Sequence, residues 1–297
     1  MNTFTGFYRI IRPGNVLVCA LSVFSGGLIG GKPLQLLNEA VLSLLQGGGI
    51  PFWFLRVIFA AFSASLILAA GNVYNDVRDI KADWVNTPNR PIPSGLTPRA
   101  ATIFAAALAF SGVLLSLPLG LNGIAVAIAA AVLLILYDLR LKGVPLLGNA
   151  LVAILGGIAF LYGGIAGNAI AQALIPAVFA ALFHLGREII KDAADLRGDR
   201  EAGIRTFATE RGAGFSAAIA AGVFFLLAIF AAFPAACGRF GMGYLLIIAI
   251  GVWPVLAYTT ASSLIHPTEM NLRRVAFYLK LDMPVGVLAV LAGFQGW

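Results

Sequence analysis

Apolar runs long enough to cross a lipid bilayer recur along almost the whole chain. A spanning helix needs about 20 consecutive apolar residues, and only helices and closed barrels satisfy every backbone hydrogen bond inside lipid. With 60% hydrophobic residues, the 297-residue chain lies outside the composition of soluble globular proteins. The pattern predicts an all-α polytopic membrane protein with about nine transmembrane helices, at 14–31, 52–75, 99–118, 121–138, 146–167, 170–190, 213–233, 242–262 and 275–296.

We interpret residues 1–297 as one membrane-embedded domain. Its two longest polar connections, 76–98 and 191–212, each follow an even-numbered helix, with four helices between equivalent positions. This spacing predicts two pseudo-repeated four-helix units plus a ninth helix. The two cysteines, Cys19 and Cys237, lie in or near apolar runs and indicate neither a metal site nor a disulfide framework.

Charged residues gather on one side of the predicted bundle. Of the 20 Lys and Arg residues, only Lys32, Arg56 and Arg239 fall on the other side, and of the 13 Asp and Glu residues only Glu39 does. The positive-inside rule therefore makes the N-terminal side cytoplasmic, in the cell (plasma or inner) membrane. Acidic residues contribute little to topology, so their one-sidedness predicts a functional face. Topology also accounts for the net charge of +7, and no nucleic-acid partner is expected.

Two segments on that face carry the same acidic spacing, D-x2-D-x3-D. Its members are Asp76, Asp79 and Asp83 in the first segment and Asp192, Asp195 and Asp199 in the second. On one continuous helix these positions fall within about 60° of each other, where like charges repel. Hard oxygen ligands suit Mg²⁺, which leaves coordination positions for water and substrate phosphate. The spacing therefore predicts Mg²⁺ bound at both segments, with a polyanion between them.

We expect carboxylates and one amide to bind the metal. These residues are Asn72, Asp76, Asp79, Asp83, Asp192, Asp195 and Asp199, of which Asp76, Asp79, Asp192 and Asp195 are predicted to be catalytic. Basic and amide side chains nearby are candidates to bind a diphosphate. They are Asn75, Arg90, Lys142, Lys191 and Arg12. The alternative for the cations is simple pairing with the acids or with lipid head groups.

The two segments resemble the UbiA superfamily of intramembrane prenyltransferases. The family motif N-D-x-x-D-x-x-x-D is matched at 75–83, its trailing N-R-P-I-P-S-G at 89–95, and its second motif, D-x-x-D-x-x-G-D, at 192–199. The resemblance implies two Mg²⁺ ions between the motifs and a prenyl diphosphate bound by its head group. It also implies an allylic cation that an acceptor nucleophile captures, next to a bilayer-embedded cavity.

Within the superfamily, the segment 187–192 is most similar to the digeranylgeranylglyceryl phosphate synthases. That similarity implies Mg²⁺-dependent transfer of a geranylgeranyl group to a lipophilic acceptor, geranylgeranylglyceryl phosphate, in ether-lipid synthesis. Prenylation of an aromatic quinone precursor or of chlorophyllide is the alternative, because those enzymes share both motifs. A divalent-cation transporter would need acids near the bilayer midplane, and here they cluster at one face. A CDP-alcohol phosphotransferase would need a D-G-x-x-A-R lead, which this sequence lacks.

Overall fold

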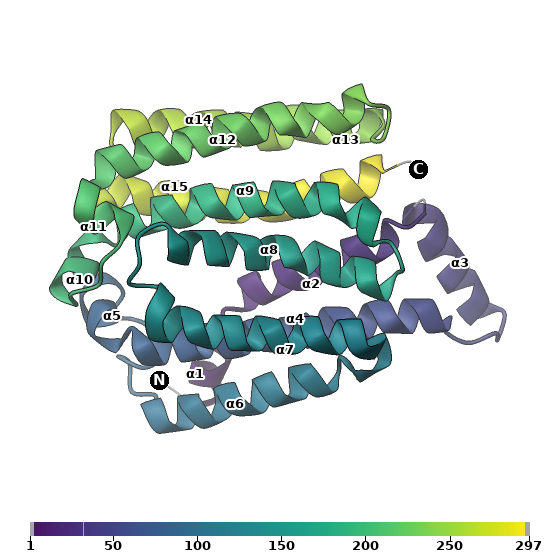
Figure 1. The fold of residues 1–297 in the computed structure, drawn as a ribbon, viewed down its shortest axis with the longest axis horizontal. Coiled ribbons are helices and arrows are strands. Elements are labelled where there is room, and N and C mark those ends of the chain that lie inside the picture. The colour runs from purple at the N-terminus through teal and green to yellow at the C-terminus, as the bar shows by residue number, and fades with distance from the viewer. Residues whose placement is uncertain (1–2, 32, 295–297) are drawn as a thin grey trace.

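The computed structural model describes residues 3–31 and 33–294, and its regular elements in these ranges are helices (Figure 1). This confirms the all-α prediction. The first half contains α1 (Thr3–Ile10), α2 (Pro13–Leu28), α3 (Pro33–Leu45), α4 (Phe52–Arg78), α5 (Ile80–Asn86), α6 (Pro98–Leu114), η1 (Leu117–Leu119) and α7 (Gly120–Leu136). The second half contains η2 (Tyr137–Leu141), α8 (Leu147–Ala166), α9 (Ile170–Ala194), α10 (Leu196–Glu201), α11 (Phe207–Arg211), α12 (Ala213–Ala236), α13 (Met242–Ile247), η3 (Ile248–Val252), α14 (Trp253–Ile265) and α15 (Glu269–Gly293).

The long helices match the predicted spans closely at most of their ends. The last one starts earlier than expected, at Glu269 instead of residue 275, and ends at Gly293. The predicted end at residue 296 lies outside the described residues. The match reflects a simple constraint, since lipid thickness fixes the length of each apolar run.

The predicted count of nine spans is not confirmed. Within the described ranges, seven helices are long and apolar enough to cross a membrane, or eight if α1 and α2, bent by 48°, form one span. One of the seven, Pro98–Leu141, contains 44 residues and includes both α6 and α7. Figure 1 shows these two helices folding back beside each other, through a turn at Gly120 with φ 76°. A count of nine requires each of them to cross.

Cysteine labelling tests this part of the topology. With Cys19 and Cys237 replaced, single cysteines at Ser94 and Asn122 should react with a membrane-impermeant maleimide from opposite sides of the membrane. The reason is that α6 separates the two positions, and both are exposed. The charge distribution further predicts that Ser94 faces the cytoplasm. Labelling of both cysteines from one side would show that α6 does not cross.

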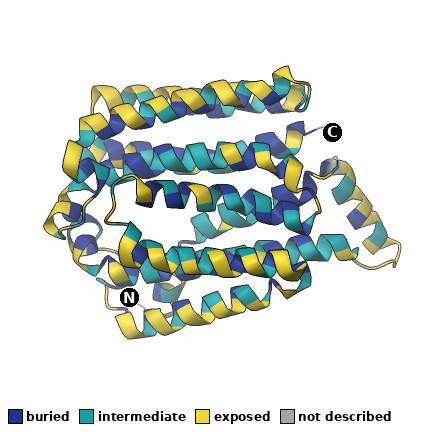
Figure 2. Cartoon of the chain, viewed as in Figure 1, coloured by how far each residue is buried: buried dark blue, intermediate teal, exposed yellow. Residues whose placement is uncertain are grey.

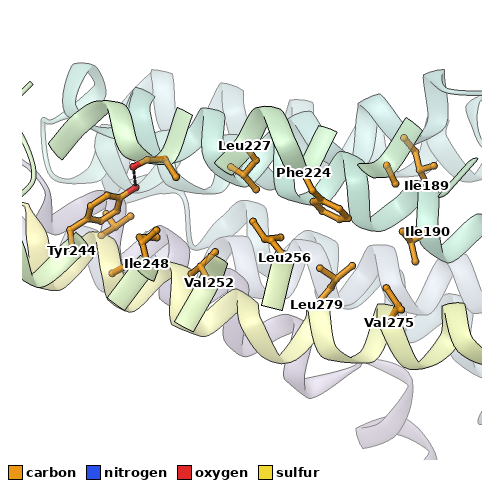
Figure 3. Packing of buried hydrophobic residues seen from close by; sticks show 14 of the residues in the cluster. Ile189, Ile190, Phe224, Leu227, Tyr244, Ile248, Val252, Leu256, Val275 and Leu279 are labelled. Carbon is orange, nitrogen blue, oxygen red and sulfur yellow. Dashed lines mark hydrogen bonds between the residues drawn. The ribbon is translucent and has the colours of Figure 1, made fainter. Parts of the chain in front are cut away.

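Buried apolar side chains hold the second half of the bundle together. Ile190 from α9, Phe224 from α12, Leu256 from α14 and Leu279 from α15 meet in one cluster (Figure 3). The Tyr244 hydroxyl, at the far end of this cluster, donates a hydrogen bond of 2.7 Å to a backbone carbonyl of α12. The cluster fixes α15 against α9, which matters because both helices contribute to the site below.

The outward faces of the bundle are apolar as well. Ile103 and Phe110 on α6 and Phe225 and Phe233 on α12 are exposed, and Figure 2 shows exposed residues along these helices. A ring of apolar side chains of this kind is typical of a lipid-facing surface. The chain is therefore a multi-pass membrane protein.

Small residues allow α2 and α8 to approach very closely. A Cβ on Gly163 would lie 1.9 Å from the Val23 carbonyl oxygen, and one on Gly26 would lie 2.1 Å from the Phe160 carbonyl oxygen. Such glycine contacts are common where membrane helices pack backbone to backbone. They anchor α2 and so fix the position of Arg12, the residue that precedes it.

Candidate active site

Both acidic segments interrupt their helices at the second aspartate. Helix α4 ends at Arg78 and α9 at Ala194, and the next residues have nearly the same backbone angles, φ −91° and ψ 9° at Asp79 and φ −100° and ψ 9° at Asp195. The short helices α5 and α10 then follow. The prediction of three carboxylates along one continuous helix was therefore wrong in both segments. The third carboxylates, of Asp83 and Asp199, lie on the short helices and are buried.

Predicted diphosphate-binding residues contact the first acidic segment. Arg90 donates from a single guanidinium nitrogen to Asp76 and to Asp83, each at 2.9 Å. Arg12 also pairs with Asp76, and Lys142 pairs with Asp79. Burial raises the pKa of Asp83 above its ordinary value, and Arg90 opposes that rise.

An amide network extends this cluster toward α7. Asn75 donates to the Asp138 carboxylate at 2.8 Å and accepts from Arg12 at 3.0 Å. The Asn72 amide nitrogen donates to the Ile11 carbonyl at 3.0 Å. That bond supports the connection between α1 and α2, where Arg12 adopts the left-handed conformation, φ 55°. Asp138 is buried and was not among the predicted site residues, although it lies four positions before Lys142, which was.

The second acidic segment has fewer cationic contacts. Asn149 donates to Asp192 at 2.7 Å, and Arg273 lies 3.7 Å from Asp195. Burial and, to a lesser extent, the nearby Asp192 carboxylate raise the pKa of Asp199 to about 7. A divalent cation bound beside these oxygens would favour their ionised forms.

Glu188, one turn before the second segment, pairs with two cations. It accepts from Arg187 at 2.8 Å and from Lys191 at 3.1 Å. Lys191, predicted to contact a diphosphate, is thus held by Glu188 and not by the aspartates of the motif.

Lys142 connects the two segments. It follows η2, a single π-helical turn whose extra residue redirects the chain, and its backbone nitrogen donates to the Tyr137 carbonyl at 2.8 Å. Its ammonium group pairs with Asp79 and lies close enough to Asp192 and Asp199 to interact with both electrostatically. The two acidic segments therefore lie on either side of Lys142, and the space around its ammonium group is called the chamber below.

Asn86 joins the segments on their outer side. Its side chain accepts from the Gly198 backbone nitrogen at 3.1 Å and donates to the Asp195 carbonyl at 3.1 Å. Its own carbonyl accepts from Arg273 of α15 at 2.5 Å. Figure 1 shows α5 and α10 at the same end of the bundle, as this bridge requires. No motif or periodicity in the sequence indicated a role for Asn86.

A cavity of about 230 Å³ lies in the bundle beside the chamber. Its polar end is formed by Arg12, Asn75, Asp138, Arg187 and Lys191. Its walls farther in are apolar and include Leu68, Val126, Leu134 and Ala159. A charged mouth with an apolar interior fits a molecule with an anionic head and a hydrocarbon tail.

Residues 40–281 match the model of the UbiA prenyltransferase family. The chain belongs to this family. A digeranylgeranylglyceryl phosphate synthase from Natronomonas pharaonis is 34% identical over 98% of this chain and 100% of its own length. A second enzyme of that name, from Methanopyrus kandleri, is 33% identical over 96% of this chain and 98% of its own length.

Solved structures superpose on this UbiA-family chain over nearly its full length. A digeranylgeranylglyceryl phosphate synthase structure superposes with a TM-score of 0.71 at 29% identity, covering 99% of each chain. A UbiA homolog from Archaeoglobus fulgidus, bound to DMAPP and Mg²⁺, superposes with a TM-score of 0.60 at 15% identity, covering 96% of this chain and 99% of its own. The second likeness shows a shared fold.

The site's donor set fits Mg²⁺, although no preformed cage is present. Among the residues that the structure describes, no three His, Cys, Asp or Glu side chains are close enough to hold a metal by themselves. Three carboxylates of the first segment are instead paired with Arg12, Arg90 and Lys142. The available ligands are carboxylate and amide oxygens, and Mg²⁺ commonly takes one or two carboxylates and completes its shell with water and substrate phosphates. The arrangement fits a metal that binds together with a diphosphate.

Gly198→Ala should damage the bridge between the two segments. A Cβ at this position would lie 2.2 Å from the Asn86 amide nitrogen, so the Asn86 side chain must move and lose its bonds to α10. We expect a loss of about 1–3 kcal/mol in stability, the usual range for overpacking, together with reduced turnover. The thermal midpoint in detergent measures this. Gly222→Ala is the matched control, because its added Cβ meets nothing within 4 Å. An unchanged midpoint for Gly198→Ala would contradict the role of Asn86.

Proposed function

We propose that this chain transfers the geranylgeranyl group of geranylgeranyl diphosphate to geranylgeranylglyceryl phosphate, forming a second ether bond on the glycerol. The observation that carries the proposal is the near full-length match to synthases of digeranylgeranylglyceryl phosphate, at 34% and 33% identity. The facing acidic segments and the apolar cavity behind them support it, because they suit an anionic head and a prenyl tail.

We assign metal binding to both acidic segments. Asp76 and Asp79 on one side, and Asp192 and Asp195 on the other, would hold Mg²⁺ together with the diphosphate, with Asn72, Asp83 and Asp199 as supporting ligands. When bound, Mg²⁺ neutralises the negative charge that develops on the departing diphosphate.

Basic residues of the chamber would then exchange partners. Arg12, Arg90 and Lys142 pair with carboxylates, and these carboxylates are the proposed metal ligands. The three cations would then donate to diphosphate oxygens, with Asn75 and Lys191 beside them. The C1–oxygen bond of the donor breaks, the diphosphate leaves with the electron pair, and the acceptor hydroxyl oxygen bonds to C1. Its proton passes to the basic oxygens of the departing diphosphate.

The cavity protects the reactive carbon. Its inner walls are apolar, and Tyr162, at its inner end, is hydrogen-bonded to Ser63 at 2.9 Å. An allylic cation formed at the mouth of such a cavity is shielded from water on the side of its tail. We propose that the mouth opens on the cytoplasmic side of the membrane, and the concentration of Lys and Arg residues on that face supports this.

Product formation tests the proposal. The purified protein is incubated with Mg²⁺, labelled geranylgeranyl diphosphate and, in separate reactions, geranylgeranylglyceryl phosphate, an aromatic quinone precursor and chlorophyllide. We expect label only in the diether phosphate. Label in the aromatic or the chlorophyllide product, with none in the diether, would overturn the assignment of the acceptor.

A further inference from the structure

Lys280 is a cation without an acidic partner. It lies half-buried on α15, and no ion pair links it to any acid in the described part of the chain. Its Cε and Nζ atoms lie 3.5 Å from the position that a Cβ on Gly14 would take, which puts the ammonium group beside the start of α2. It interacts electrostatically with Arg187 and Arg12. An ammonium group placed among other cations inside a membrane protein is costly unless an anion joins them.

Arg187 has an unused donor at the same place. Its Nη1 atom donates to Glu188, but its Nε atom is buried and has no hydrogen-bond partner. The side chain lines the cavity near Lys191. A buried N–H group without an acceptor costs free energy, so this donor favours a ligand that carries an oxygen acceptor.

Cations exceed acids on this side of the chamber. Beside Lys280, Arg187 and Lys191 share the single Glu188 carboxylate, and Lys280 pairs with no acid among the described residues. Farther along α9 and on α10, the Asp192 and Asp199 carboxylates have no ion-pair partner among the described residues. The chamber therefore has an acidic part, suited to metal and diphosphate, and a basic part, suited to an anion without metal.

We propose that Lys280 and Arg187 bind the phosphate monoester of the acceptor lipid and so select phosphorylated acceptors. The inference rests on the proposed function, in which two anionic head groups occupy one chamber. The diphosphate would bind with Mg²⁺ at the acids, while the monoester would bind directly to the two cations through charge-assisted hydrogen bonds. Lys280 interacts electrostatically with Arg12, and Arg187 lines the same cavity as Arg12, so a phosphate held there would lie near the bound donor.

A variant that removes the charge of Lys280 tests the proposal through the KM values of the two substrates. We expect Lys280→Gln to raise the KM for geranylgeranylglyceryl phosphate by about 10- to 100-fold, the effect of losing one charge-assisted hydrogen bond. The KM for geranylgeranyl diphosphate should stay unchanged, and Lys280→Arg should restore the acceptor KM. Arg274→Gln, an exposed change on the same helix, is the control. A higher KM for the diphosphate with an unchanged acceptor KM would overturn the assignment.

A binding assay separates this inference from the proposed function. Labelled geranylgeranylglyceryl phosphate is retained on immobilised protein in EDTA without donor, with unphosphorylated geranylgeranylglycerol as the blank. We expect phosphate-dependent retention by the wild type and its loss in Lys280→Gln. Equal retention by both proteins, or retention that requires Mg²⁺, would refute the site. If the wild type prenylates a different acceptor, the proposed function fails, and this assay still decides whether Lys280 binds a phosphate monoester.

Discussion

Asp79→Asn and Asp192→Asn, made singly, should each lower turnover at saturating prenyl diphosphate by about 10²- to 10³-fold or more, the range seen when a group that stabilises transition-state charge is removed. Each change replaces a proposed ligand by an amide of nearly the same shape. Asp79 pairs with Lys142 and Asp192 accepts from Asn149, so the two variants probe opposite sides of one chamber. Steady-state turnover in detergent measures the effect.

The control for these variants is Glu201→Gln. Glu201 also lies on α10, but it is 49% exposed and its ion pair among the described residues is with the exposed Arg197, so its loss should leave turnover unchanged. Elution profiles and thermal midpoints show whether each variant is folded. A folded Asp79→Ala protein with near-wild-type turnover would contradict the proposal that both acidic segments bind metal.

Removal of divalent cations should abolish turnover. After exhaustive treatment with EDTA we expect no detectable product, because Arg12, Arg90 and Lys142 remain paired with carboxylates when no metal replaces them. Added Mg²⁺ should restore activity, since the available ligands are hard oxygens without Cys or His at ligand spacing. The assay repeated with EDTA already saturated with Mg²⁺ shows that the chelator itself is harmless. Full activity in metal-free protein would exclude the metal-dependent mechanism.

The helices could be placed from the sequence because the bilayer restricts them. Each apolar run must span a fixed thickness, so even approximate run lengths located α4, α8, α9 and α12 well. The helix breaks at Asp79 and Asp195 could not be placed in the same way. No Pro or Gly lies between Asp76 and Asp83, and Gly198 comes after the break in the second segment. The helical period predicts which side chains share a face only within one continuous helix.

The part of the site that lies in or near the charged motifs could be predicted from the sequence. Arg12, Asn75, Arg90 and Lys142 were selected near charged segments, and the structure places all four at the first acidic cluster. Their binding of a diphosphate stays a prediction, as do the metal ligands and the four-helix repeat.

Two contacts could not be predicted from the sequence. Asn86 meets a residue 112 positions away, and Lys280 meets the start of α2 through tertiary packing alone. Such pairs depend on how α5, α10 and α15 come together, and a single sequence contains no periodic signal for that.

The position of the bound metal shows whether both acidic segments bind it. Crystals of the protein grown with Mn²⁺ and geranylgeranyl thiodiphosphate, a donor analogue with a cleavage-resistant C1–sulfur bond, can be measured at the manganese absorption edge. We expect two anomalous peaks in one chamber, one beside the Asp76 and Asp79 carboxylates and one beside those of Asp192 and Asp195, with the diphosphate between them. Peaks at only one segment, or away from both, would contradict it.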